Sequence, residues 1–141
     1  MQPNAPHAGR LPRVLVADDV PENRQLFSLY LRGAAEVVTA ATAEAALDVL
    51  RQGPIDVALL DINYGGGMDG FGAIAAIRAD DAIADVPAAA LTAHVAPRDR
   101  DQCLAAGFDA FLAKPLRRAE MKEAVARLHA LGTARRAPQA V

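Results

Sequence analysis

The sequence has little cysteine: Cys103 is the single example among 141 residues. One cysteine can form neither an internal disulfide nor a metal cluster built on cysteine ligands, so both are excluded as sources of stability. A lone thiol is typical of proteins in a reducing compartment, and the cytoplasm is therefore the expected location.

Excess positive charge and long apolar runs are also lacking. The formal net charge is −2 and the pI is about 5.9, so no sequence-wide positive field is present to hold a nucleic-acid backbone. No apolar run approaches the ~18 residues that a membrane span needs, and the first ten residues contain no signal-peptide core. Neither nucleic acid nor a membrane is an expected partner.

What the sequence does contain is enough apolar material for a core. Hydrophobic residues make up 52% of the chain, and the mean hydropathy is +0.12. A chain of this length buries roughly two thirds of its unfolded surface in one domain. We expect that domain to cover residues 13–131, with flexible tails at 1–12 and 132–141, which lack a hydrophobic period.

Five short apolar runs recur along the domain, and each is followed by a stretch with helical spacing. The runs are continuously apolar, which is typical of parallel strands covered on both faces. They cover residues 14–17, 36–40, 56–60, 87–91 and 110–113. Five strand–helix units with right-handed crossovers predict an α/β fold, a three-layer sandwich around one parallel sheet.

Chemically useful side chains stand where these runs end. Asp18 and Asp19 follow the first run, Asp61 the third, Thr92 the fourth and Lys114 the fifth. Ligand sites in open α/β sheets form beyond the carboxyl ends of the strands. If the three aspartates meet, the first and third strands must be neighbours, which gives the flavodoxin-like strand order 2-1-3-4-5.

Such an acidic cluster requires compensation. Carboxylates ~4 Å apart repel each other by about 4 kcal/mol at an effective dielectric constant near 20. The cluster therefore needs a cation or raised pKa values. Mg²⁺ is the expected cofactor, because it prefers hard oxygen ligands and is commonly held by one or two carboxylates together with waters and phosphate.

Four motifs carry a family resemblance in this order: VADD, ALLDIN with MDG downstream, ALTA and AFLAKP. Together they resemble the CheY-like receiver domain of two-component response regulators, over essentially residues 13–131. The resemblance implies a phosphorylation-activated signalling switch in a phosphorelay.

The resemblance also implies roles for individual residues. Asp61 would be the phosphoacceptor, a carboxylate nucleophile that also contacts the metal. Asp19 would bind Mg²⁺ directly, Asp18 through water, and Asn63 through its backbone carbonyl. Lys114 would neutralise charge on the transferred phosphoryl group.

Two further positions match the family's switching residues, and a pair of residues matches its cis peptide. Thr92 resembles the hydroxyl that donates to a phosphoryl oxygen and draws its loop inward. Phe111 occupies the position of the partner aromatic, where many members have Tyr. Lys114 and Pro115 resemble a pair joined by a cis peptide bond, which would aim the lysine into the site.

The resemblance implies signalling partners rather than a substrate. A histidine kinase or a histidine phosphotransfer protein would donate the phosphoryl group. Output would come from a downstream protein docked on the face formed by the fourth helix, fifth strand and fifth helix, from a homodimer, or from a larger chain. The expected activity is limited to self-phosphorylation and autodephosphorylation, so the chain is not expected to be an enzyme in the ordinary sense.

The loop after Asp61 departs from the family pattern. The usual loop reads D-x-x-M-P-x-M-D-G, whereas this chain reads DINYGGGMDG, which is one residue longer and has glycine in place of the proline. Gly65, Gly66 and Gly67 predict an unusually mobile loop. Metal affinity, phosphorylated lifetime and partner choice could all differ as a result.

Three alternatives remain open. A haloacid-dehalogenase-type phosphatase would normally need a second aspartate where Asn63 stands, and it would need a cap domain. A flavodoxin-like electron carrier would need a phosphate loop where Asp18 and Asp19 stand. A degenerate receiver would bind partners without phosphate.

His94, close to Thr92, is interpreted as a surface histidine.

Overall fold

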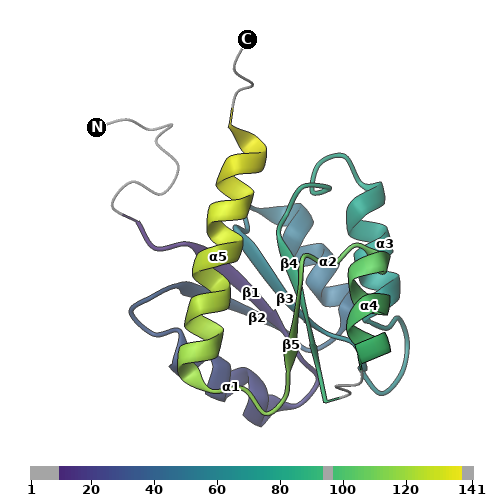
Figure 1. Ribbon diagram of the computed structural model, residues 1–141, viewed down its shortest axis with the longest axis horizontal. Coiled ribbons are helices and arrows are strands. Elements are labelled where there is room, and N and C mark those ends of the chain that lie inside the picture. Colours follow the sequence, from purple (N-terminus) through teal and green to yellow (C-terminus); the bar gives the residue numbers. More distant parts are fainter. Residues whose placement is uncertain (1–9, 94–96, 138–141) are drawn as a thin grey trace.

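The structure is a computed structural model that describes residues 10–93 and 97–137; His94 and parts of both predicted tails lie outside these ranges. Strands and helices alternate along the described chain (Figure 1). The elements are β1 (Arg13–Ala17), α1 (Pro21–Tyr30), β2 (Glu36–Ala40), α2 (Ala43–Gln52), β3 (Val57–Asp61), α3 (Gly70–Ala79), β4 (Ala88–Thr92), α4 (Pro97–Ala106), β5 (Ala110–Ala113) and α5 (Arg118–Arg136).

The strands form one parallel sheet in the order β2-β1-β3-β4-β5, which confirms the predicted fold class. The register aligns Ala17 of β1 with both Ala40 of β2 and Leu60 of β3. All five strands therefore finish at the same edge of the sheet.

Helices cover both faces of this sheet (Figure 1). Because side chains alternate along a strand, β1 sends Val14 and Val16 to one face, and Leu15 and Ala17 to the other. The first pair packs in a cluster with α1 and α5, and the second pair packs with α2, α3 and α4. Burial on both faces explains the apolar runs of the inner strands β1, β3 and β4, whereas the edge strands β2 and β5 are only partly buried.

Two helices beside the carboxyl edge begin with side-chain caps. The Thr42 hydroxyl accepts a hydrogen bond from the Ala45 N–H at 3.0 Å at the start of α2. The Asp69 carboxylate accepts one from the Gly72 N–H at 2.8 Å at the start of α3. Each bond satisfies a backbone donor that the helix itself leaves unpaired.

Helix α5 extends beyond the predicted domain boundary at residue 131. The structure is helical through Arg136, so residues 132–136 belong to the fold and not to a tail. Tertiary contacts hold this last turn: Gly132 is buried so closely that a Cβ there would lie 2.7 Å from the Pro87 Cγ, and Arg135 pairs with Asp109. Composition alone does not reveal such contacts.

Within residues 10–93 and 97–137, no helix combines the length and the apolar character required to cross a bilayer. Even α5, with 19 residues, is charged along its exposed side.

Candidate acidic site at the carboxyl edge of the sheet

Three aspartates converge at the carboxyl edge of β1 and β3. Asp18 and Asp19 directly follow β1, and Asp61 is the last residue of β3. Because β1 and β3 are parallel neighbours in matched register, their ends lie side by side. One carboxylate oxygen from each aspartate lies within 4.8 Å of the others, as the sequence analysis anticipates.

Asp18 is the most firmly held of the three. Its side chain is fully buried. One carboxylate oxygen accepts the Val20 N–H at 2.9 Å, and the other accepts the Asn23 side-chain amide at 3.3 Å and the Lys114 Nζ at 2.8 Å. A carboxylate with both oxygens engaged by the protein suits a ligand that contacts a metal through water.

Asp19, in contrast, is exposed. The backbone of Gly65 passes close to it, since a Cβ at Gly65 would lie 3.4 Å from the Asp19 Oδ2. An exposed carboxylate with glycine opposite leaves room for an ion to approach.

Lys114 joins Asp18 to Asp61. Its Nζ lies 3.0 Å from the Asp61 Oδ2, and its backbone N–H donates to the Thr92 carbonyl at 2.7 Å, which ties the ends of β4 and β5 together. The peptide bond between Lys114 and Pro115 is cis. The ammonium is thus placed between two carboxylates from two other strands.

Burial and charge pull the pKa values at this site in opposite directions. Asp61 is only 5% exposed, and this burial raises the pKa of its carboxyl above the usual value despite the hydrogen bond from Lys114. Burial by itself would lower the pKa of Lys114, but its hydrogen bonds to Asp18 and Asp61 outweigh that effect and raise it. The ammonium therefore remains charged at neutral pH.

The donor set fits a divalent cation. Three carboxylates and one ammonium leave two uncompensated negative charges when every group is ionised. The available ligands are hard oxygens, which Mg²⁺ prefers over nitrogen or sulfur. The site can therefore hold Mg²⁺ and place it beside the Asp61 carboxylate.

Thr92 is bonded to Lys114 through its backbone carbonyl, whereas Phe111 lies within β5, opposite Ala90 of β4. Thr92 is buried at the end of β4, and it lines a cavity of about 180 Å³ together with Asn63 and Cys103. Phe111 is half-buried on β5 and packs against the core cluster that includes Cys103.

The loop between β3 and α3 contains a contact that the sequence analysis missed. The Asn63 N–H donates to the Asp61 Oδ1 at 3.2 Å, a hydrogen bond between residues two positions apart. The next residue, Tyr64, is 8% exposed, and its hydroxyl donates to the Ala17 carbonyl at 3.3 Å. The sequence did hold a signal for this contact: Tyr64 is an aromatic residue inside a polar, glycine-rich loop.

Two of the three consecutive glycines have a conformational reason to be glycine. Gly65 and Gly67 adopt φ of 75° and 70°, in the left-handed region that residues with a Cβ rarely enter. At the end of the loop, the Met68 N–H donates to the Glu44 carboxylate of α2 at 3.2 Å. The loop is therefore tied to neighbouring elements on both sides of the glycines.

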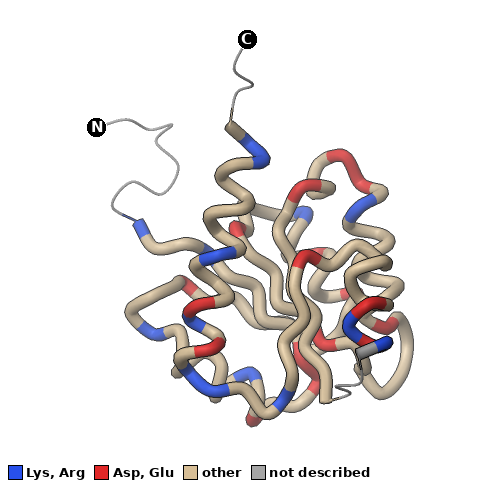
Figure 2. The backbone as a smooth tube through the Cα atoms, in the orientation of Figure 1, with Lys and Arg blue, Asp and Glu red and all other residues tan. Residues whose placement is uncertain are grey.

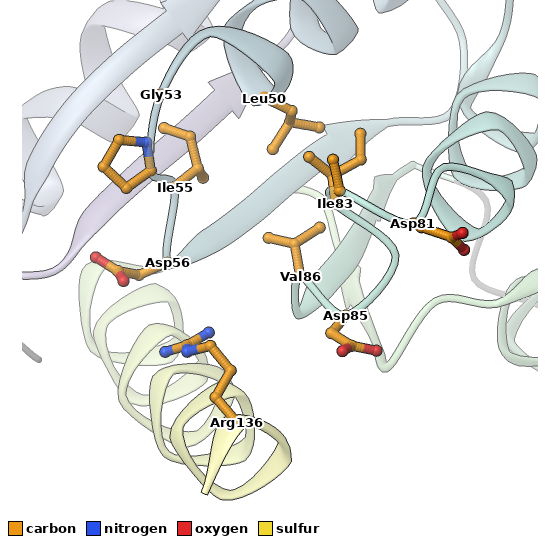
Figure 3. Close-up of a pocket in the computed structure, with 11 residues that line it drawn as sticks. Leu50, Gly53, Ile55, Asp56, Asp81, Ile83, Asp85, Val86 and Arg136 are labelled. Carbon is orange, nitrogen blue, oxygen red and sulfur yellow. The ribbon is translucent and has the colours of Figure 1, made fainter.

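A second cavity, of about 390 Å³, lies at the opposite edge of the sheet (Figure 3). Apolar and charged side chains both line it, among them Leu50, Ile55, Ile83, Val86, Asp56 and Arg136. None of the predicted site residues lines it. Figure 2 shows acidic residues at both edges of the sheet, so neither cavity volume nor acidity identifies the chemical site, whereas the Asp–Lys arrangement does.

Sequence comparison links the chain to signalling proteins. The family model for the response regulator receiver domain matches residues 14–126. Sensor protein GacS of Pseudomonas syringae pv. syringae is 35% identical over 138 residues, covering 95% of this chain and 15% of GacS. The heme response regulator HssR of Staphylococcus saprophyticus is 32% identical over 118 residues, covering 83% of this chain and 50% of HssR. The chain thus spans half or less of these two relatives.

Solved structures agree with these matches. The receiver domain of sensor histidine kinase PA1611 from Pseudomonas aeruginosa PAO1 has a TM-score of 0.78 and 31% identity, covering 85% of this chain and 98% of that domain. That structure has a magnesium ion coordinated in its active-site cleft. The chemotaxis response regulator CheY4 of Vibrio cholerae has a TM-score of 0.78 and 28% identity, covering 84% of this chain and 98% of CheY4.

Proposed function

Because the chain belongs to the response regulator receiver domain family of two-component systems, we propose that it is a phosphorylation-activated switch with Asp61 as its phosphoacceptor. The observation that carries this proposal is the position of Asp61. Its carboxylate lies among two other carboxylates and the Lys114 ammonium, at the edge where parallel α/β sheets place their chemistry.

In the proposed reaction, an Asp61 oxygen attacks the phosphorus of a phosphohistidine on a histidine kinase or phosphotransfer protein. A P–O bond forms while the P–N bond breaks, and the electron pair goes to the imidazole nitrogen, which then takes up a proton. Lys114 stabilises the negative charge that spreads over the equatorial oxygens. Its bond to Asp61 holds the ammonium within 3.0 Å of the attacking carboxylate.

Asp18, Asp19, Asp61 and the Asn63 carbonyl would hold Mg²⁺, with Asp18 acting through water. The ion, when bound, supplies the positive charge that lets a phosphoryl group approach three carboxylates. The protein residues keep the ligands in place: Lys114 and Asn23 orient Asp18, while the Asn63 N–H orients Asp61.

Signalling would follow from a local rearrangement. Thr92 would donate its hydroxyl to a phosphoryl oxygen, and Phe111 would change its burial in response. A downstream protein would recognise the surface of α4, β5 and α5, and homodimer formation is a second route. Function in the cytoplasm, with activity limited to self-phosphorylation and autodephosphorylation, completes the proposal.

Intact mass spectrometry tests the phosphoacceptor. Wild type incubated with Mg²⁺ and acetyl phosphate should gain one phosphoryl group, and Asp61→Ala should gain none. Asp81→Ala is the matched control, because Asp81 is exposed at the opposite edge of the sheet and should leave labelling unchanged. Labelling of Asp61→Ala, or sustained phosphate release with high turnover, would contradict a switch that stores one phosphoryl group on Asp61.

A further inference from the structure

Tyr64 occupies an unusual place for an aromatic side chain in a glycine-rich loop. Its ring is buried although the flanking residues Asn63 and Gly65 are exposed. Its hydroxyl reaches back to β1 and donates to the carbonyl of Ala17, the residue directly before the Asp18–Asp19 pair. One side chain thus connects the loop after β3 to the strand end that carries the two aspartates.

The peptide group between residues 63 and 64 is therefore held from two directions. On one side, the Asn63 N–H is bonded to the Asp61 carboxylate. On the other, the Tyr64 side chain is bonded to Ala17. The carbonyl of this peptide group is the proposed third protein ligand of the metal, so the two contacts together restrict where that oxygen points.

The three glycines that follow make this anchor necessary. Gly65, Gly66 and Gly67 are exposed and have no side chain to pack. The next attachment of the loop is the Met68 N–H on Glu44, which lies beyond the glycines. Without the Tyr64 hydroxyl, the segment from Asn63 to Gly67 would keep the Asn63 N–H bond and the packing of the Tyr64 ring, and its next hydrogen bond would be the one at Met68.

We propose that Tyr64 is a positioning residue for the metal site, and that its hydroxyl fixes the Asn63 carbonyl in a loop that glycine would otherwise leave loose. This inference rests on the proposed function. The hydroxyl acts as the donor in this contact, because the Ala17 carbonyl can only accept.

The substitution Tyr64→Phe tests the inference, because it removes the hydroxyl and keeps the ring. Loss of a residue that orients a metal ligand weakens binding by roughly 10- to 100-fold, and for a single hydroxyl we expect about tenfold weaker Mg²⁺ binding by calorimetry. Acetyl phosphate labelling should slow at low Mg²⁺ and recover fully at saturating Mg²⁺. Tyr64→Met, which fills the space without a hydroxyl, is a second variant with the same expected result.

Tyr30→Phe is the matched control. Its hydroxyl also donates to a backbone carbonyl, that of Leu116 at 3.0 Å, but this bond joins α1 to the segment before α5 and not to the loop after β3. The control should lose comparable stability and keep wild-type Mg²⁺ affinity. Because the sequence has two tyrosines and no tryptophan, the Tyr30→Phe protein also makes Tyr64 fluorescence a direct report on Mg²⁺ binding.

The outcomes separate the two proposals. Mg²⁺ affinity within twofold of wild type in both Tyr64 variants, or a labelling defect that excess Mg²⁺ does not restore, overturns the positioning role. An equal loss of affinity in Tyr30→Phe also overturns it, because the effect would then be one of general stability. If wild type itself neither binds Mg²⁺ nor is labelled on Asp61, the proposed function fails first.

Discussion

Replacing Lys114 by methionine should destabilise the protein most strongly when Mg²⁺ is absent. The Lys114 side chain is 18% exposed, and its Nζ lies 2.8 Å from the Asp18 Oδ2 and 3.0 Å from the Asp61 Oδ2. Without it, the acidic cluster keeps three carboxylates and loses the ammonium that is hydrogen-bonded to two of them. Methionine has similar length and no charge, so the change removes the compensation and leaves most of the packing.

The distances set the magnitude. At about 3 Å and an effective dielectric constant near 20, each Lys–Asp pair is worth roughly 5–6 kcal/mol before desolvation is counted. Desolvation of the ions offsets much of this, and breaking a buried pair by removing one partner typically costs about 3–5 kcal/mol. We expect a loss of that size in the free energy of unfolding, and Mg²⁺ should restore about 2–3 kcal/mol at a hundredfold excess over its Kd.

Urea denaturation followed by circular dichroism, with EDTA and with Mg²⁺, measures both quantities. The matched control is Lys122→Met, since Lys122 is the only other lysine and is exposed on α5. Equal stability of the two variants in EDTA would refute the charge-compensation argument. So would a Mg²⁺-dependent gain no larger in Lys114→Met than in wild type when both proteins are measured at the same Mg²⁺ concentration.

Two further predictions concern other parts of the fold. Burial opposes ionisation of Asp109, but hydrogen bonds from Arg135 and from the Ala88 N–H outweigh this effect and lower the pKa of Asp109. The ionised carboxylate therefore stabilises the fold above about pH 4, and this stabilisation is lost as the pH falls through the lowered pKa of the folded state. Asp109→Asn should lower the free energy of unfolding by about 2–3 kcal/mol at pH 7. When this free energy is measured by urea denaturation at several pH values, its fall at acid pH should be less steep in the variant than in wild type; an equally steep fall would contradict the prediction. Gly70→Ala should destabilise the protein by about 1–3 kcal/mol or more, because the new Cβ would lie 2.5 Å from the Asp61 carbonyl oxygen. Gly66→Ala is the control: its Cβ would meet open space, so its stability should change by less than about 0.5 kcal/mol. Similar melting temperatures for the two alanine variants would show that the backbone at Gly70 adjusts.

The sheet and the meeting of its acidic residues were predictable from the sequence because both follow from one pattern. Apolar runs that alternate with helical spacing indicate a parallel sheet, and parallel strands finish at one edge. Residues that directly follow those runs, such as Asp18, Asp61 and Lys114, therefore had to lie near each other. The strand order followed from requiring Asp18 and Asp61 to be neighbours.

The contacts that hold the loop and the last helical turn could not be predicted in the same way. Tyr64 bonds to a backbone carbonyl 47 positions away, and no side-chain pattern encodes a backbone acceptor. In the sequence, Arg135 is indistinguishable from a charge in a tail, because its partner Asp109 is 26 positions away and only the fold brings the two together. Glycine composition suggested mobility at residues 65–67, whereas positive φ at Gly65 and Gly67 gives glycine a second reason to be there.

The two edges of the sheet differ in what they carry: the acidic cluster lies at the carboxyl edge, and ion pairs that stabilise the fold lie at the amino edge. At the carboxyl edge, three carboxylates lie within 4.8 Å of one another, and that arrangement costs folding free energy because like charges are brought together. At the amino edge, Asp109 accepts hydrogen bonds from Arg78 of α3 and Arg135 of α5, and Arg78 also donates to three backbone carbonyls between residues 84 and 107. Asp109 and Lys114 flank the same short strand, so the two groups lie about 16 Å apart along β5 at 3.3 Å per residue. Over that separation the ion pairs at the amino edge can hold α3, β5 and α5 together while the charge at Asp61 changes, as the proposed phosphorylation requires.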